Sequence, residues 1–441
     1  MKINFNNIIA PIKPLHGVCN SPVAYGDAIP SFKEAGIPYV RLHDTGGTYG
    51  GFRFVDIPNI FRDFNADEND PASYDFAFTD AYLTSLHKSG CDIIYRLGVT
   101  IENQFRIKAY RIDPPADFAK WARVCANIVR HYNDGWANGL HLNITYWEIW
   151  NEPENPPMWT GTREQYFELY RVAANYLKQQ FPNIKIGGYA GCGFYAINRP
   201  NMSDFYKGFV TWFNDFLQFC KNPATAAPLD FYSWHLYTAD PDEIILHANY
   251  VRKQLDDAGF RDTLSVFDEW NRIDGSADQF DLMKEMPGAT FVAEAFCKMQ
   301  NGPIDIANYY DALPTRSYGG LFYFPSQKPS KTYYPFKAFN ELYKLGKQVV
   351  VENDTPHVHA IAATDGDGHH AVFMVNTGDT QALLKLETDV VFSQLTLLDA
   401  THLYVPAPEC LQNNIVLLPP QSVALLQQCI MHKAQFIIHN S

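Results

Sequence analysis

Residues 144–153 read ITYWEIWNEP, and this stretch decides which fold the sequence predicts. Its apolar part is short and rich in β-branched and aromatic residues, as in a strand that is buried on both faces. Thr162 and Gln165 then form a capping-box pattern, and apolar residues recur at helical spacing as far as Leu177. A second apolar strand follows at 184–189. A strand, a helix and a strand in this order predict two parallel strands joined by a helix.

The same alternation runs from about residue 15 to residue 325. Strands are predicted at 15–19, 39–44, 92–98, 144–152, 184–189, 231–237, 264–271 and 304–311, and helices at 74–88, 118–132, 162–177, 203–220, 240–257 and 287–301. Eight such units predict an α/β fold of the (β/α)₈ TIM-barrel type. A doubly wound open sheet is the alternative, but eight units over this length favour closure.

After Gly346 the pattern changes to short strands separated by turns such as 364–368. We therefore expect three parts: a catalytic barrel over 15–345, a small antiparallel β-sandwich over 346–441, and an N-terminal segment, 1–14, that could pair with the sandwich.

Composition excludes several classes of protein. The chain has 441 residues, of which 35 are basic and 48 acidic, for a net charge of −13. An acidic chain without a basic cluster is not expected to bind nucleic acid or an anionic membrane. No apolar segment of the sequence is nearly long enough to span a bilayer. Aromatic residues make up 15% of the chain, which fits large cores, a sugar-binding cleft, or both.

Other motifs predict no cofactor. The eight cysteines are scattered, without CxxC spacing or a histidine cluster, so we expect reduced thiols and neither disulfides nor a metal site. The N-terminus lacks a signal-peptide pattern, which predicts a cytoplasmic location. The sequence carries no signal for an oligomeric state.

Two glutamates are the main candidates for chemistry. Glu152 and Glu269 each end an apolar strand, at the rim where the active sites of TIM barrels lie. Two carboxyl groups across a cleft can cleave a glycosidic bond, because one protonates the leaving oxygen and the other attacks the anomeric carbon or activates water. Their separation decides between retention and inversion, and the sequence does not reveal it.

Further polar residues at the same rim are candidates for substrate binding. Asn151 could bind a sugar hydroxyl beside the reacting carbon. Tyr237 could donate a hydrogen bond to a nucleophile on the next strand, and His235 shares its face; a core tyrosine and a core histidine are the alternatives. Arg41 could orient a carboxylate, and His43 could reach sugar hydroxyls; a plain ion pair is the alternative.

Two further carboxyl groups are expected to be structural. Glu148 lies below the rim and should be buried in a polar network. Asp268 alternates with Glu269 and should face away from the barrel axis. The rings at strand ends or in adjoining loops are expected to line the cleft, and these are Trp150, Trp159, Tyr237, Trp270, Tyr309, Tyr310 and Phe322.

The ordered set of motifs resembles glycoside hydrolase family 39, a family of β-xylosidases and α-L-iduronidases within the retaining enzymes of clan A. The segments that carry the resemblance are Arg41-Leu-His43, Trp147-Glu-Ile-Trp-Asn-Glu-Pro153, His235-Leu-Tyr-Thr238, Asp268-Glu-Trp-Asn271 and the stretch 328–340. The resemblance implies that Glu152 is the acid/base and Glu269 the nucleophile. Two departures concern the sugar site: Tyr310 stands where the family's xylosidases have a tryptophan, and the loop 45–52 is unlike theirs.

Together these observations predict a retaining exo-glycosidase that releases a terminal pentose from plant-type oligosaccharides. β-Xylosidase activity leads, and the alternatives are an α-L-arabinosidase, acting on furanosides or pyranosides, or an endo-acting β-glycanase. A protein of another class, a non-hydrolytic sugar-binding protein on a barrel scaffold, would lack one carboxyl group or hold the two far apart.

Overall fold

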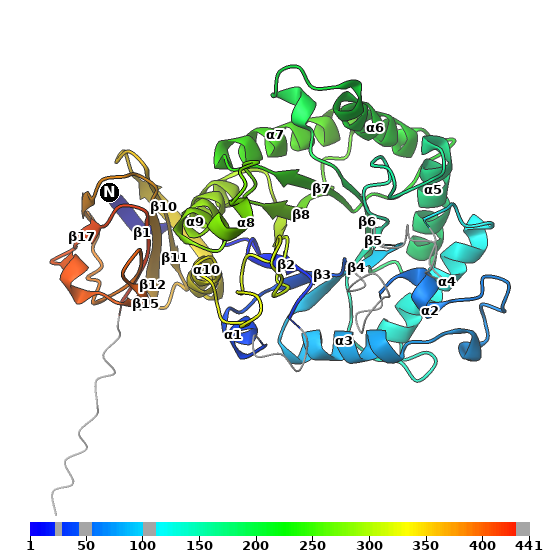
Figure 1. Cartoon of the computed structure of the whole chain (residues 1–441), viewed down its shortest axis with the longest axis horizontal. Coiled ribbons are helices and arrows are strands. Elements are labelled where there is room, and N and C mark those ends of the chain that lie inside the picture. The colour runs from blue at the N-terminus through cyan, green and yellow to red at the C-terminus, as the bar shows by residue number, and fades with distance from the viewer. Residues whose placement is uncertain (23–28, 44–54, 100–111, 429–441) are drawn as a thin grey trace, which may run out of the picture.

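The computed structural model describes residues 1–22, 29–43, 55–99 and 112–428. Eight parallel strands form a closed barrel, because β2 pairs with both β3 and β9. The predicted (β/α)₈ barrel is therefore confirmed over the open sheet (Figure 1). Its strands are β2 (Gly17–Cys19), β3 (Tyr39–Arg41), β4 (Asp92–Leu97), β5 (Tyr146–Ile149), β6 (Lys185–Gly191), β7 (Phe231–Tyr237), β8 (Leu264–Asn271) and β9 (Ile306–Tyr309).

Helices surround the barrel strands (Figure 1). They are α1 (Ile29–Glu34), α2 (Ile57–Ile60), α3 (Ala77–Lys88), α4 (Phe118–Asn133), α5 (Arg163–Gln180), α6 (Asp204–Lys221), α7 (Pro241–Ala258), α8 (Gln279–Leu282), α9 (Met286–Asn301) and α10 (Tyr333–Leu345), with 3-10 turns η1 (Pro71–Ser73) and η3 (Tyr195–Ile197). A further 3-10 turn, η4 (Pro408–Cys410), lies in the C-terminal part of the chain and contacts β14, β16 and β17. The predicted capping box is present, since the Thr162 hydroxyl accepts from Gln165 N and the Gln165 side chain accepts from Thr162 N. Helix α10 was not expected from the sequence.

Side chains fill the lower part of the barrel. Ile94, Phe231, Val266 and Ile306 are buried together, although they come from β4, β7, β8 and β9. Residues from opposite walls of a closed barrel can meet only near its axis, so these side chains form a floor. The polar residues at the carboxyl ends of the strands lie above this floor.

A β-sandwich follows the barrel and confirms the second part of the predicted fold. One sheet has the strand order β1-β10-β11-β12-β18-β14-β15 and the other β13-β17-β16. Their bounds are β1 (Lys2–Pro11), β10 (Lys347–Glu352), β11 (Val358–Thr364), β12 (His370–Asn376), β13 (Ala382–Lys385), β14 (Gln394–Leu398), β15 (Leu403–Pro406), β16 (Leu411–Gln412), β17 (Ile415–Leu418) and β18 (Ser422–Gln427). The N-terminal strand β1 runs antiparallel to β10 at the edge of the larger sheet.

The larger sheet is buried on both faces, as β12 shows. Val372 and Met374 belong to the core between the two sheets, whereas Phe373 and Val375 belong to the core of the barrel. This follows from the alternation of side chains along a strand. The barrel-side face packs on α9 and α10, and the Phe373 and Phe339 rings lie 6.1 Å apart. Since α10 ends at Leu345 and β10 begins at Lys347, we propose the domain boundary at this junction.

Two findings bear on the expectations about cysteines and membranes. The seven cysteines within the described ranges are free and buried. Among the helices of the described residues, none combines the length and apolar character needed to cross a bilayer.

Candidate active site

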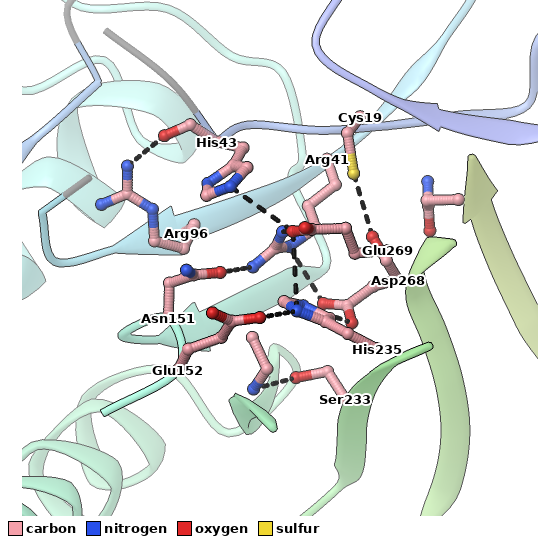
Figure 2. A network of polar contacts seen from close by, with 12 residues as sticks. Cys19, Arg41, His43, Arg96, Asn151, Glu152, Ser233, His235, Asp268 and Glu269 are labelled. Atoms are coloured by element: carbon pink, nitrogen blue, oxygen red, sulfur yellow. Dashed lines mark hydrogen bonds and ion pairs between the residues drawn. The ribbon is translucent and has the colours of Figure 1, made fainter. Parts of the chain in front are cut away.

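Arg41, at the end of β3, is the centre of a buried polar network (Figure 2). Its side chain is fully buried. Its Nη2 lies 2.7 Å from Glu148 Oε2 and donates to Asn151 Oδ1 at 2.8 Å, its Nε lies 2.9 Å from Asp268 Oδ2, and its Nη1 donates to Glu269 Oε2 at 3.3 Å. One guanidinium thus holds groups from β5, β8 and the loop after β5 in a fixed arrangement. Arg41 positions these groups and has no exposed surface for a substrate.

Glu152 is held by an unusual backbone turn just beyond β5. Trp150 has a φ of 75° and Glu152 a φ of 45°. Such left-handed conformations are uncommon for residues with large side chains and concentrate at functional sites. Gly98 makes room for this turn, because a Cβ there would lie 3.1 Å from Trp150 Cα. The amide of Glu152 donates to the carbonyls of Tyr189 and Ala190 at the end of β6.

Glu269, in β8, faces three groups that stabilise an ionised carboxylate. The Tyr237 hydroxyl donates a short hydrogen bond to Oε1, Arg41 Nη1 donates to Oε2, and His43 Nε2 lies 3.4 Å from Oε2. Burial and the charge of Glu269 raise the pKa of Tyr237 well above its ordinary value, so the hydroxyl remains a donor. The predicted contact between Tyr237 and a carboxylate on the next strand is confirmed.

His235, in β7, lies between the two glutamates. Its Nδ1 is 2.7 Å from Glu152 Oε1 and 3.6 Å from Glu269 Oε2, and its Nε2 is 3.4 Å from Asp268 Oδ1. Burial lowers the pKa of His235, but the surrounding carboxylates, Glu269 first, raise it well above its ordinary value. Burial likewise raises the pKa of Glu152, but hydrogen bonds, first from His235, lower it to about 2. The proton shared by this pair therefore rests on the imidazole.

The two glutamates are close together. One carboxylate oxygen of Glu152, one of Glu269 and a ring nitrogen of His235 all lie within 4.8 Å of one another. The same trio offers ligand atoms that could hold a metal ion. Since His235 Nδ1 lies 2.7 Å from Glu152 Oε1, we interpret the trio as a hydrogen-bonded acid–base cluster.

The expectation for Asp268 was wrong. Asp268 does not face away from the barrel axis, because its carboxylate is fully buried beside Arg41 and His235. The reason is an irregularity in the register of β7 and β8: Trp234 pairs with Phe267 and His235 with Glu269, so Asp268 is an extra residue. A bulge of this kind interrupts the strict alternation of side chains.

Glu148 is buried in the same network, as expected from its position below the rim. Burial raises the pKa of Glu148 to about 8. Burial also disfavours charge on Asp268, but Arg41 lowers the pKa of Asp268 to about 2. Glu148 is thus protonated and Asp268 ionised at neutral pH.

Asn151 and Tyr310 each lie just beyond the carboxyl end of a barrel strand, β5 and β9 respectively. Asn151 is 1% exposed, and since its Oδ1 binds Arg41, its Nδ2 points elsewhere and has no partner among the described residues. Tyr310 follows β9, is half-buried, and its ring lies 5.4 Å from that of His43 and 6.4 Å from that of Tyr237. The structure adds Tyr318, which contacts both the Tyr237 and Tyr310 rings and which no strand-end pattern indicated.

Trp270 does not reach the cleft. Its indole is fully buried and packs against rings of the barrel wall and of α9, 5.2 Å from Tyr309 and 6.2 Å from Phe291. The next residue after an inward-facing Glu269 points outward, so this side chain belongs to the core. The other strand-end rings with 4% exposure or less are also core residues rather than cleft residues, namely Trp150, Trp159, Tyr309 and Phe322. The loop 45–52 lies outside the described residues.

Glu154 was missed at the sequence level, although it belongs to the same Asn-Glu-Pro-Glu segment as Glu152. Its Oε1 accepts a hydrogen bond from Cys192 N at 2.6 Å. Burial and the charge of Glu152 raise the pKa of Glu154 to about 8. A neutral carboxyl group therefore lies next to the ionised one.

Two curated proteins show sequence similarity to this chain. A β-xylosidase from Geobacillus stearothermophilus is 28% identical over 210 residues, which is 43% of this chain and 37% of that protein. A β-xylosidase from Caldicellulosiruptor saccharolyticus is 25% identical over 370 residues, which is 75% of this chain and 67% of that protein. The chain thus spans about a third of the first relative and two thirds of the second.

Solved structures share the fold of the whole chain. A glucosidase from Croceicoccus marinus has a TM-score of 0.75 at 21% identity, over 97% of this chain and 98% of that one. A family 39 β-xylosidase from Caulobacter crescentus has a TM-score of 0.71 at 18% identity, over 97% and 99%. The model of glycosyl hydrolases family 39 matches residues 25–307, which is well over half of the sequence. The chain therefore belongs to family 39 of the glycosyl hydrolases.

Proposed function

We propose that this protein is a retaining exo-glycosidase that releases a terminal β-linked xylose from plant-type oligosaccharides. The observation that carries the proposal is the short distance, within 4.8 Å, between carboxylate oxygens of Glu152 and Glu269. Retaining enzymes hold their two carboxyl groups about 5–5.5 Å apart, whereas inverting enzymes need about 6.5–9.5 Å to fit a water molecule. The same proximity argues against a non-hydrolytic sugar-binding protein.

The reaction has two displacements. In the first, Glu269 attacks the anomeric carbon while the glycosidic C–O bond breaks and Glu152 gives a proton to the leaving oxygen. In the second, the Glu152 carboxylate takes a proton from water, and the water oxygen displaces Glu269 from the anomeric carbon. Tyr237 and Arg41 stabilise the carboxylate of Glu269 as it is released.

The proton for the first step is stored on His235. It lies in a 2.7 Å contact with Glu152 Oε1, so it needs to move only along this hydrogen bond. A glycosidic oxygen bound beside Glu152 favours the neutral acid, which can donate, over the carboxylate. Once the leaving group has departed, Glu152 is ionised and ready to act as base. This exchange separates the protonation states of the two glutamates, as the mechanism requires.

The sugar-binding groups support a small terminal sugar but do not distinguish a pentose from a hexose. Asn151 Nδ2 has no partner among the described residues, His43 Nε2 lies 3.4 Å from Glu269 Oε2, and the ring of Tyr310 lies 5.4 Å from that of His43. Xylose is favoured because the two sequence relatives described above are β-xylosidases. An α-L-arabinosidase and an endo-acting β-glycanase are the alternatives, and the cytoplasmic location stays a prediction.

Two variants test the mechanism on an aryl β-xyloside. Glu269→Gln is expected to abolish turnover, and Glu152→Ala is expected to lose activity that azide restores, with a β-glycosyl azide as product. Glu164→Gln is the matched control, because Glu164 lies on the surface of α5 with its side chain 70% exposed. Activity like that of the wild type in Glu269→Gln would refute the assignment.

A panel of aryl glycosides tests the sugar. The panel consists of the β-xyloside, α-L-arabinofuranoside, α-L-arabinopyranoside and β-glucoside, and kcat/KM is expected to be highest for the β-xyloside. A higher value for either arabinoside or for the glucoside would replace xylose by that sugar while leaving the roles of Glu152 and Glu269 intact.

A further inference from the structure

The turn that carries Glu152, residues 152–155, is attached to the end of β6 at two points. The amide of Glu152 donates to the carbonyls of Tyr189 and Ala190 at 3.2 and 3.1 Å. Two residues later, Glu154 Oε1 accepts a hydrogen bond at 2.6 Å from the amide of Cys192, which directly follows β6. The first attachment joins backbone atoms and does not depend on the side chain at position 152. The second depends entirely on the side chain of Glu154.

Glu154 makes this contact as a buried and neutral group. Its side chain belongs to a residue that is 9% exposed, and its Oε2 is buried without a hydrogen-bond partner among the described residues. A charge in such a place is costly, and burial followed by the charge of Glu152 raises the pKa of Glu154 to about 8. A protonated carboxyl group still has a carbonyl oxygen that accepts from Cys192. It therefore holds the turn without placing a second negative charge beside Glu152.

The carboxylate of Glu152 depends on this turn for its position. Asn155 donates from its amide to the Glu152 carbonyl at 2.9 Å, and from Nδ2 to Glu152 Oε2 at 2.9 Å. The other carboxylate oxygen, Oε1, lies 2.7 Å from His235 Nδ1. Glu152 also has a φ of 45°, a conformation that persists only where surrounding contacts hold it. A shift of residue 154 would thus move both the acid/base and the asparagine that orients it.

We propose that Glu154 is a positioning residue for the acid/base: its neutral carboxyl group holds the turn 152–155 on the end of β6, so that Glu152 stays in reach of His235 and of the leaving oxygen. This inference rests on the proposed function, since it assumes that Glu152 protonates the leaving oxygen. Proton transfer requires hydrogen-bond distance, and a misplacement of about 1 Å can cost about 100-fold in rate. The loss is expected only for substrates whose leaving group needs a proton.

The test compares two substrates that differ in their need for an acid. Xylobiose has a sugar leaving group that must be protonated, whereas a dinitrophenyl β-xyloside has a leaving group that departs as a stable anion. For each variant, the ratio of kcat/KM for xylobiose to kcat/KM for the aryl xyloside is measured, since both values report the first displacement. Glu154→Leu has no acceptor for the Cys192 amide and is expected to lower this ratio about 10- to 100-fold.

Glu154→Gln is the conservative variant. Its amide has nearly the shape of a protonated carboxyl group, and its oxygen can accept from the Cys192 amide, so the ratio is expected to equal that of the wild type. A ratio as low as that of Glu154→Leu would overturn the proposal of a neutral acceptor. If Glu154→Leu did not fold, Glu154→Asp would take its place with the same expected direction, because its shorter side chain withdraws the oxygen from Cys192.

Glu68→Leu is the matched control. Glu68 has a side chain that is only 13% exposed, and it pairs with Arg123 on α4 at 2.7 Å instead of with a residue of the site. Its ratio is expected to equal that of the wild type.

Two outcomes in Glu154→Leu would overturn the positioning role and leave the roles of Glu152 and Glu269 intact. One is a wild-type value of kcat/KM for both substrates. The other is an equal loss for both, which would show that Glu154 supports the fold and not the acid/base. If the wild-type enzyme turned over neither substrate, the proposed function would fail, and the positioning role with it.

Discussion

Replacing Arg41 by Met is expected to destabilise the protein strongly, because this one side chain is the shared partner of three buried carboxyl groups, among them the ionised Asp268. The guanidinium is fully buried and lies within 3.3 Å of Glu148, Asp268 and Glu269. Methionine replaces the unbranched stem of arginine but carries no charge and donates no hydrogen bond. The variant therefore leaves the ionised Asp268 without its cationic partner in a buried site with little water to solvate it.

The magnitude follows from the burial of these groups. Removing one partner of a buried ion pair costs about 3–5 kcal/mol, and we expect the free energy of unfolding to fall by about this amount at neutral pH. Arg41→Lys is expected to lose less, because an ammonium keeps the charge but cannot contact all the acceptors at once. Arg62→Met is the matched control: Arg62 pairs with Asp75 at the surface with its side chain 62% exposed, and such pairs contribute about 0–1 kcal/mol.

The direction in which the free energy of unfolding changes with pH differs between the wild type and Arg41→Met. In the wild type, Arg41 holds the pKa of Asp268 at about 2, below its ordinary 3.8. Asp268 therefore contributes stability that is present above about pH 4 and is lost as the pH falls toward 2. Without Arg41, burial raises the pKa of Asp268, so the folded variant favours the neutral acid and loses stability as the pH rises through the ordinary pKa.

Urea unfolding followed by tryptophan fluorescence, at about pH 4 and about pH 7, measures both effects. The difference in free energy of unfolding between wild type and Arg41→Met is expected to be larger at the higher pH. An equal difference at the two pH values would refute the electrostatic explanation. A difference no larger than that of Arg62→Met would refute the assigned role of Arg41 altogether.

Three further substitutions test the site and the barrel wall. Tyr237→Phe removes a hydrogen bond to a buried carboxylate, so kcat/KM for an aryl β-xyloside is expected to fall about 10- to 100-fold, and an unchanged value would contradict the contact with Glu269. Gly187→Ala places a Cβ 2.2 Å from the Phe231 carbonyl oxygen and is expected to cost about 1–3 kcal/mol of stability in urea unfolding. Gly208→Ala, in α6 with open space around it, is the opposite case and is expected to stabilise the protein by about 0.5–1 kcal/mol. If both glycine substitutions changed the free energy of unfolding in the same direction, this reasoning would be contradicted.

Sequence patterns were sufficient for the architecture. Short apolar runs alternating with period-3.6 patterns between 15 and 325 predicted all eight barrel strands, because a strand buried on both faces and an amphipathic helix leave different local signatures. The two catalytic candidates were predicted for a related reason. Glu152 and Glu269 end apolar strands, and in a barrel of this kind such ends meet at one rim.

The contacts within the site required the tertiary structure. Strict alternation wrongly placed Asp268 outside the barrel, because the bulge depends on how β8 pairs with β7. Trp270 was expected in the cleft because it is an aromatic residue at the end of a strand, but it packs against α9. His235 could not be identified as the proton store, since its state depends on carboxylates contributed by β8 and by the loop after β5.

Local interactions thus set the elements of this protein and their order, and with them the rim at which Glu152 and Glu269 lie. Only the closed barrel decides which side chains share a proton and how near the two carboxylates come. The physical reason is that strand and helix formation depend on neighbours along the chain. Protonation and the separation of the two carboxylates depend instead on groups that are distant in sequence and close in space.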